Sequence, residues 1–500
     1  MENYLIGIDV GTTGTKTMLF SETGRVLSHM YRGYNLSNPA IGYCEQNSED
    51  WWKAVTETVR NVTNHCPSVK NIRAISLSLQ GGTIVPVDEN GCPLRPAIVW
   101  NDRRCNEERQ KFIQEIGTED YMYQTSGWSL GKGLPALELR WLHEHEPATF
   151  SKAKMFLSVA DYISFRMTGI AAVDLSDAGI NQMYDIRKEQ YDNEILSFIG
   201  VQENRLPKVV HTGEIIGNLT PEAAAELGLT TETVLVAGAH DQYAVAVGAG
   251  ANHHGDILIG TGTCWVVTAL SDQPRFNTGF SQSVAAVNGM WGSISSLSTG
   301  GVCLDWMRKK ITLGSNTKTC ISYAEINNNL QKRSAAAEGL FFYPFSGIYG
   351  KNKEFGKATF TGLDLSHDQY DLIYAVMEGV VFQIAWILEK FPEYKRSSII
   401  RLAGGASKSP IWSQIVADVT GHTITIPTVA DLACVGAAVI AGTGCGLFNN
   451  IQDGYQKLAV SSNVIYPDCS KHEAYLKYFN EYKKSAQKLG ELYHFEFPDN

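Results

Sequence analysis

Residues 4–20 read Tyr4-Leu-Ile-Gly-Ile-Asp-Val-Gly-Thr-Thr-Gly-Thr-Lys-Thr-Met-Leu-Phe20. An apolar strand leads to Asp9, a turn of glycines and threonines follows, and a second apolar run ends at Phe20. This pattern predicts a β-hairpin whose glycines let backbone N–H groups point into a concavity that suits phosphate oxygens. Asp9 can hold Mg²⁺ directly or through water. Because no G-x-x-x-x-G-K-[ST] pattern is present and no helix follows the turn, the stretch is not a P-loop. A glycine-tipped hairpin without a functional role is the alternative.

A second stretch repeats the pattern. Asp256-Ile-Leu-Ile-Gly-Thr-Gly-Thr-Cys-Trp-Val-Val-Thr268 again reads strand, Gly/Thr tip, strand. Two such hairpins in one chain suggest a duplicated domain with a nucleotide held between the copies. Chance similarity between two unrelated hairpins is the alternative.

Composition limits the class of protein. The chain has 500 residues, a formal net charge of −10 and a pI near 5.7, which argues against binding of a nucleic-acid backbone. The N-terminus lacks a signal-peptide pattern, and no run of 18 apolar residues occurs, so we expect no membrane span. The ten cysteines include no C-x-x-C and are expected to be reduced thiols. These features predict a cytoplasmic protein.

Strands and helices alternate along the whole chain, which predicts an α/β fold. We expect the domain junction between Leu219 and Val247, and divide the chain into domains of residues 1–240 and 241–500. The clearest predicted elements are helices over 48–63, 107–116, 134–145, 367–391, 410–419 and 471–492 and strands over 72–79 and 233–237.

Asp241 is the candidate catalytic residue. It follows the apolar strand that ends at Gly238, at a corner where a helix begins. A carboxylate at the carboxyl end of a buried strand is well placed to meet a substrate. Transfer from ATP to an alcohol needs one acid to accept the hydroxyl proton and another to manage Mg²⁺, and Asp241 and Asp9 fit these tasks. A role as a helix N-cap is the alternative for Asp241.

A third element lies in Ile399-Ile-Arg-Leu-Ala-Gly-Gly-Ala-Ser-Lys-Ser-Pro-Ile-Trp412. A strand ends at Gly404-Gly405-Ala406, and a helix is expected from Pro410. Small residues let a flat purine and ribose lie on the backbone, and a helix N-terminus favours a nearby phosphate. A plain turn is the alternative.

Together these segments resemble the FGGY family of carbohydrate kinases, within the superfamily of actin, hexokinase and heat-shock chaperones. Ala358-Thr-Phe-Thr-Gly-Leu363 and Asp371-Leu-Ile-Tyr-Ala-Val-Met-Glu378 are similar to the family's C-terminal signature. The family's N-terminal signature has a lysine where this chain has Glu138. The resemblance implies two duplicated ribonuclease-H-like domains with a cleft between them, each with a mixed five-stranded sheet.

The resemblance also implies roles for individual residues. Asp241 would be the general base and, with Asp9, would bind Mg²⁺. The ATP-binding residues would be Gly11, Thr12, Thr13 and Lys16 in the first hairpin, Gly260, Thr261, Gly262 and Thr263 in the second, and Gly404, Gly405, Ala406 and Ser409 in the adenosine motif. The sugar-binding residues would be Gln80, Gly81, Gly82, Trp100, Asn101, Arg103, Asp241 and Gln242.

The substrate is less well defined. Glycerol kinases have an Arg-Glu pair, and xylulokinases a Met-His pair, where this chain has Gly81-Gly82. The segments around Asp161 and Asp177 look most like the xylulokinase branch, so D-xylulose or another ketopentose is the first expectation. The two glycines are expected to leave extra room in the pocket. Gluconate, ribulose, a tetrulose or erythritol, autoinducer-2 and glycerol stay open as alternative substrates.

Two further alternatives concern the class of protein and its partners. An actin-like or chaperone-like ATPase would share the hairpins and the adenosine motif, but would not need the segment from Trp100 to Arg104. A catalytically inactive homologue is disfavoured by the presence of Asp9 and Asp241. The expected partners are ATP, Mg²⁺ and a small sugar, with no nucleic acid and no membrane. The oligomeric state is left open, with a homodimer as one option.

Overall fold

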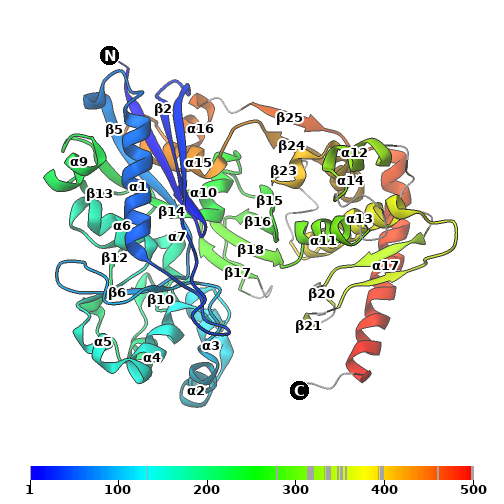
Figure 1. Cartoon of the computed structure of the whole chain (residues 1–500), viewed down its shortest axis with the longest axis horizontal. Helices are drawn as coiled ribbons and strands as arrows, with labels where there is room; N and C mark the ends of the chain where they lie inside the picture. The colour runs from blue at the N-terminus through cyan, green and yellow to red at the C-terminus, as the bar shows by residue number, and fades with distance from the viewer. Residues whose placement is uncertain are drawn as a thin grey trace. The chain divides into compact units, whose positions relative to one another are not determined.

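The computed structural model describes residues 2–131, 133–276, 280–311, 320–331, 333, 339–345, 348–349, 353–354, 357–391, 394, 399–458 and 461–496. The chain forms two compact units, and Figure 1 labels their elements. The first unit comprises Met1–His253, Leu270–Ser293 and Val429–Val460, and the second comprises His254–Ala269, Ile294–Thr428 and Ser461–Asn500. The units therefore do not follow a single cut in the sequence.

The first unit contains the helices and strands before residue 250, one later strand and two helices from late in the chain. Its strands are β1 (Tyr4–Val10), β2 (Gly14–Ser21), β3 (Val26–Gly33), β4 (Glu45–Gln46), β5 (Ile72–Leu79), β6 (Val85–Val87), β7 (Ala97–Ile98), β8 (Met155–Leu157), β9 (Ala172–Asp174), β10 (Tyr184–Asp185), β11 (Gln190–Tyr191), β12 (Lys208–Val210), β13 (Ile215–Asn218), β14 (Val234–His240) and β17 (Ser281–Val284). Its helices are α1 (Ser48–Thr63), α2 (Asn106–Ile116), α3 (Glu119–Ser126), α4 (Pro135–His145), α5 (Pro147–Lys152), α6 (Val159–Thr168), α7 (Leu175–Ala178), α8 (Asn193–Ile199), α9 (Pro221–Leu227), α10 (Asp241–Gly248), α15 (Leu432–Gly444) and α16 (Ile451–Lys457).

The main sheet of the first unit has six strands in the order β13-β14-β5-β1-β2-β3. The neighbours β14, β5 and β1 are parallel, and the hairpin strands β2 and β3 continue the sheet antiparallel. The carboxyl ends of β1, β5 and β14 therefore meet at one edge. Asp9, Gln80 and Asp241 lie on or just after these ends, so the topology gathers three of the predicted site residues at one sheet edge.

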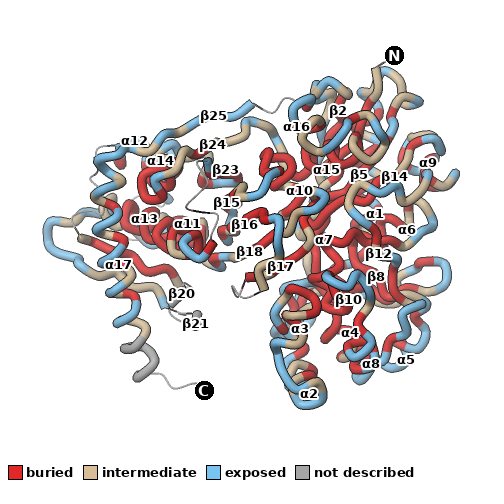
Figure 2. The backbone as a smooth tube through the Cα atoms, turned by 180° about the vertical axis from the view of Figure 1, so that it is seen from behind, coloured by how far each residue is buried: buried red, intermediate tan, exposed pale blue. Residues whose placement is uncertain are grey.

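Helices cover both faces of this sheet. Because successive side chains of a strand point to opposite faces, Ile6 and Ile8 of β1 pack in one cluster with Trp51 of α1, while Gly7 faces α15. A Cβ on Gly7 would lie 2.0 Å from the carbonyl oxygen of Cys434, so only glycine permits this close approach of α15. Figure 2 shows the neighbouring strands β5 and β14 and the helix α15 as largely buried.

The second unit contains the second hairpin. Its strands are β15 (Ile257–Thr261), β19 (Phe341–Tyr343), β20 (Ile348–Tyr349), β21 (Lys353–Glu354), β22 (Thr359–Thr361), β23 (Ile399–Gly404), β24 (Thr423–Pro427) and β25 (Ser462–Ile465), and the larger parts of β16 (Trp265–Ser271) and β18 (Trp291–Leu297). Its helices are α11 (Gly301–Ile311), α12 (Tyr323–Leu330), α13 (Gln369–Leu388), α14 (Pro410–Thr420) and α17 (Cys469–Glu496).

The two main sheets share one topology. In the second unit the strands follow the order β18-β16-β15-β23-β24-β25. The strand β15 is antiparallel to β16 and parallel to β23, as β1 is to β2 and β5, and an antiparallel edge strand ends both sheets. The predicted duplication and α/β fold are confirmed. The expected five-stranded sheet is wrong for both units, because the antiparallel edge strands β13 and β25 bring each of these strand orders to six.

The most periodic segments were predicted closely. The expected helix over 48–63 and strand over 72–79 match α1 and β5 residue for residue. The helix expected over 367–391 is α13, two residues shorter at its start and three shorter at its end. By length and composition α13 could cross a membrane, but 89% of its apolar window is buried inside the protein, so we interpret it as a core helix.

Candidate active site

At the tip of the first hairpin, the backbone carbonyl oxygens accept hydrogen bonds within the protein, whereas two backbone N–H groups have no acceptor among the described residues. The carbonyl oxygen of Gly11 accepts a hydrogen bond from the Tyr34 hydroxyl at 2.5 Å, and that of Thr12 accepts one from the Gln46 amide at 2.8 Å. The carbonyl oxygen of Thr13 is held by the N–H of Tyr34. Within the described part of the chain the N–H groups of Thr12 and Thr13 have no hydrogen-bond acceptor. Such a turn suits an anion with several oxygens.

Below the tip, three charged side chains form a cluster. Asp9 Oδ1 accepts a hydrogen bond of 2.8 Å from Ser78, and Asp9 Oδ2 lies 3.7 Å from the Lys16 ammonium. Lys16 donates a shorter hydrogen bond, 2.6 Å, to Oδ2 of Asp431. Burial and, next, the Asp431 carboxylate raise the pKa of Asp9 to about 7. Burial works to lower the pKa of Lys16, but the attraction of Asp431 and Asp9 outweighs it and raises that pKa.

Asp241 begins α10, directly after the buried strand β14. The N-cap of this helix is His240, whose ring accepts a hydrogen bond from the N–H of Gln242. The alternative role of Asp241 as the N-cap is therefore wrong. About a third of the Asp241 side chain is exposed, and its Oδ1 lies 3.2 Å from His240 Nδ1 and accepts a 3.2 Å hydrogen bond from the Gln242 amide. The carboxylate is fixed in orientation yet open to a substrate.

The space beside Gly81 is already filled. A Cβ there would lie 2.5 Å from Asp177 Oδ1, 2.7 Å from His240 Cδ2 and 2.8 Å from Ile180 Cγ2. A Cβ on Gly82 would lie 2.9 Å from Leu134, and this glycine has a φ of +69°. The expectation that the two glycines leave extra room is therefore wrong, because side chains from α7, the residues after it and the end of β14 occupy that room.

Asp177 is the polar group nearest this crowded point. Its carboxyl is fully buried, and among the described residues neither oxygen has a hydrogen-bond partner. Burial, followed by repulsion from Asp174, raises the pKa of Asp177 well above its usual range.

The other predicted sugar-binding residues differ in their exposure. Trp100 is half-exposed, and its indole N–H donates a 3.1 Å hydrogen bond to the Thr12 hydroxyl, so it links the sugar side to the first hairpin. Asn101 and Arg103 are exposed. The side chain of Gln80 is buried, and its amide donates a 3.3 Å hydrogen bond to Gln46 Oε1.

The second hairpin repeats the design of the first. Gly260 and Thr261 lie in β15, opposite Ala403 and Gly404 of β23. The tip of this hairpin is exposed. Its carbonyl oxygens accept hydrogen bonds of 3.1 Å each: that of Gly262 from the N–H of Gly301, and that of Thr263 from the N–H of Gly300. These donors lie at the start of α11, so this helix N-terminus lies against the hairpin.

Thr261 joins the second hairpin to the predicted adenosine motif. Its carbonyl oxygen accepts a 2.5 Å hydrogen bond from the N–H of Gly405, and its hydroxyl accepts one of 3.0 Å from the N–H of Ala406. Gly404 has a φ of +100° and no space for a side chain. The Ser409 hydroxyl caps α14 and donates to Asn327, so it is occupied in this structure. Two of the three predicted nucleotide-binding segments are thus adjacent in the second unit.

Sequence reasoning missed several groups that shape these sites: Ser78, Asp177, His240, Gly300, Gly301 and Asp431. Gly300-Gly301 directly before a helix was a visible signal of the kind used for Gly404-Gly405. No local pattern marks Asp431, which is 415 positions from Lys16.

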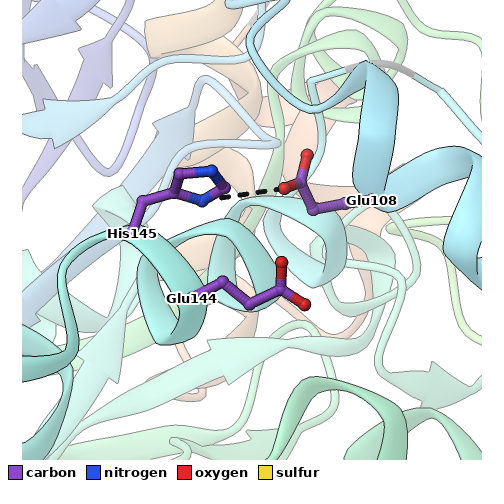
Figure 3. Close-up of side chains that lie close together, drawn as sticks. All are labelled: Glu108, Glu144 and His145. Atoms are coloured by element: carbon purple, nitrogen blue, oxygen red, sulfur yellow. Dashed lines mark ion pairs between the residues drawn. The ribbon is translucent and has the colours of Figure 1, made fainter.

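A separate cluster in the first unit combines Glu108, Glu144 and His145, whose possible ligand atoms lie within 4.8 Å of one another (Figure 3). Glu144 already bonds to the ammonium of Lys111 and, at 2.6 Å, to the guanidinium of Arg140. The carboxylate of Glu144 is thus already engaged by two cations, and Arg140 also pairs with Glu115 at 3.4 Å. We interpret it as an ion-pair network.

Comparisons with known proteins identify one family over most of the chain. Residues 4–248 match the N-terminal domain of the FGGY family of carbohydrate kinases, and residues 255–445 match its C-terminal domain. The chain is 29% identical over 493 residues to a xylulose kinase of Bacillus subtilis, covering 96% of each chain. It is 28% identical over 451 residues to a gluconokinase of the same organism, covering 88% of this chain and 87% of the other. A solved xylulose kinase from Rhodospirillum rubrum superimposes with a TM-score of 0.88 at 25% identity, covering 98% of this chain and 100% of that one.

Proposed function

The chain belongs to the FGGY family of carbohydrate kinases, and from this premise we propose that it transfers the terminal phosphate of ATP to a hydroxyl of a ketopentose such as D-xylulose. The proposal rests chiefly on Asp241, a partly exposed carboxylate at the carboxyl end of β14 whose Oδ1 accepts a hydrogen bond from the Gln242 side-chain amide. A general base must be reachable by the substrate and must point toward the hydroxyl whose proton it accepts.

The two hairpins are assigned to the phosphates. In each hairpin the carbonyl oxygens of the tip accept hydrogen bonds from other parts of the protein, and Thr12 and Thr263 carry hydroxyl groups at the tips. Donors that are already in place stabilise the charge on a transferring phosphoryl group without reorganisation. Gly404, Gly405 and Ala406 would support the adenosine, because they are fixed to Thr261 of the second hairpin.

Asp9 and Asp241 suit Mg²⁺, a hard cation that prefers carboxylate oxygens. Oδ1 of Asp9 accepts a hydrogen bond from Ser78, whereas Oδ2 lies 3.7 Å from the Lys16 ammonium. When bound with ATP, the cation would neutralise charge on the phosphate oxygens. The protein's own contribution is to hold both carboxylates at one sheet edge and to place Asp241 next to the acceptor hydroxyl.

The ketopentose assignment is supported by the names of two relatives. Besides the Bacillus subtilis xylulose kinase, an L-xylulose/3-keto-L-gulonate kinase of Escherichia coli is 29% identical over 493 residues. The gluconokinase of Bacillus subtilis, at 28% identity, makes gluconate the second candidate substrate. The Arg-Glu pair that grips glycerol in glycerol kinases is absent, and the crowding at Gly81 disfavours a different side chain in its place.

A coupled assay of ADP release tests this proposal. Purified protein is given Mg²⁺ and ATP with D-xylulose, L-xylulose, ribulose, erythrulose, gluconate, autoinducer-2 or glycerol, each at several concentrations. We expect the highest kcat/KM on a pentulose. Turnover on gluconate with none on any pentulose would replace the first substrate by the second. Highest turnover on glycerol would contradict the assignment of the sugar pocket.

A further inference from the structure

The cluster of Asp9, Lys16 and Asp431 follows from the way α15 approaches the main sheet. Asp9 and Lys16 are directly opposite each other on β1 and β2, so their side chains lie on the same face. Gly7 lies two residues before Asp9 on that face, and its missing side chain lets α15 approach. Asp431 is the N-cap of α15 and is thereby delivered to the ammonium of Lys16.

The two oxygens of Asp431 have different tasks. Oδ1 accepts a 3.1 Å hydrogen bond from the N–H of Cys434, which is the helix-capping contact. Oδ2 accepts the 2.6 Å hydrogen bond from Lys16. The capping contact needs only an oxygen, whereas the contact with Lys16 uses the charge.

The distances show which acid holds the ammonium. Lys16 Nζ is at hydrogen-bond distance from Asp431, at 2.6 Å, but 3.7 Å from Asp9 Oδ2. Nearly half of the Lys16 side chain is exposed, and an ammonium has three donors, so bonding to Asp431 leaves others for phosphate oxygens. Without Asp431, Asp9 would be the nearest remaining acid and would draw the ammonium toward itself.

We propose that Asp431 is a positioning residue, which holds Lys16 beside the first phosphate hairpin and keeps its ammonium off Asp9 Oδ2. The inference rests on the proposed function, because it takes the hairpin as a phosphate site and Asp9 as a group that faces Mg²⁺. Asp431 then fixes the position of the Lys16 ammonium near the nucleotide phosphates. Oδ2 of Asp9 stays available to Mg²⁺.

The substitution Asp431→Asn separates the two tasks, because asparagine caps helices as well as aspartate does but carries no charge. The variants are Asp431→Asn, Lys16→Met and the double variant, with Asp192→Asn as the matched control. Asp192 is the N-cap of α8, where it accepts a hydrogen bond from the N–H of Ile195, and it does not belong to the cluster. Affinity for Mg²⁺·ADP is measured by calorimetry in the absence of sugar, together with the thermal midpoint of each protein.

We expect Asp431→Asn to weaken Mg²⁺·ADP binding about five- to twentyfold, with a thermal midpoint that changes no more than that of the control. The double variant should bind as weakly as Lys16→Met alone, because residues that act through one another are not additive. Unchanged or tighter binding by Asp431→Asn, or losses that multiply in the double variant, would overturn the inference while leaving the kinase assignment intact. If the unaltered protein bound no Mg²⁺·ADP, the proposed function would fail together with it.

Discussion

Replacing Gly81 by alanine tests whether the sugar side of the site is roomy or full. The added Cβ would lie 2.5, 2.7 and 2.8 Å from atoms of Asp177, His240 and Ile180. All three distances are too short for non-bonded atoms, so the neighbours must move. Gly81 does not have a positive φ, so alanine adds no backbone strain, and the effect measures crowding alone.

The expected cost follows from the burial of those neighbours. Overpacking a core costs about 1–3 kcal/mol, and Asp177 and His240 are both buried and cannot turn toward solvent, so we expect about 2–3 kcal/mol. Because His240 directly precedes Asp241 and contacts its carboxylate, displacement of the ring should also lower kcat about tenfold. Small misplacements of a catalytic group have effects of this size.

The assay combines urea unfolding, followed by tryptophan fluorescence, with the kinase reaction. Gly217→Ala is the matched control, because a Cβ at Gly217 would make only ordinary contacts of 3.4 Å or more with Ile170 and Thr168. We expect the control to stay within about 0.5 kcal/mol of the unaltered protein, as is usual away from special positions. If Gly81→Ala were as stable and as active as the control, the pocket would be open at this point and the reasoning would be refuted.

Two further predictions concern the phosphate hairpins and a buried acid. Thr12→Val or Thr263→Val should raise the KM for ATP several-fold, because each removes a hydroxyl donor from a hairpin tip, half-buried at Thr12 and exposed at Thr263; unchanged nucleotide affinity of both variants in calorimetry would argue against the two-hairpin site. Burial raises the pKa of Glu138 well above its ordinary 4.5, and neither of its oxygens has a hydrogen-bond partner among the described residues. The folded state therefore keeps a proton that the unfolded chain releases above pH 4.5, and stability falls as pH rises from there toward the folded-state pKa. Glu138→Gln should gain stability over the unaltered protein by about 1.4 kcal/mol per pH unit in that window; a difference in unfolding free energy that is the same at pH 5 and pH 7 would contradict the buried neutral acid.

Local patterns in the sequence predicted the fold well because they reflect local physics. The continuous apolar run of β1 indicates a strand buried on both faces, the apolar stripe of α1 indicates which face of that helix is buried, and a Gly/Thr turn between two apolar runs indicates a hairpin. The duplication could also be read, since both hairpins have one pattern. The domain division at residues 240 and 241 stays a prediction, and the compact units show that Val429–Val460 folds with the first unit.

What the sequence did not predict depends on contacts between distant segments. The partnership of Lys16 with Asp431 arises because Gly7 admits α15, and neither residue carries a local sign of it. The prediction of extra room beside Gly81 was wrong for the same reason. A missing side chain leaves free space only if no other residue fills it, and here Asp177 fills it. The roles assigned to the site residues stay predictions until they are measured.

The central claim is that this chain is a sugar kinase with Asp241 as its general base, and Asp241→Asn tests it most directly. The measurement is kcat for phosphorylation of the best sugar, with Mg²⁺·ATP affinity and the thermal midpoint determined on the same preparation. We predict that kcat falls about a hundredfold or more, while the thermal midpoint is nearly unchanged and the Mg²⁺·ATP affinity falls much less than kcat, because asparagine keeps the shape of the side chain and one oxygen but cannot accept the proton. A variant with near-normal kcat would contradict the account.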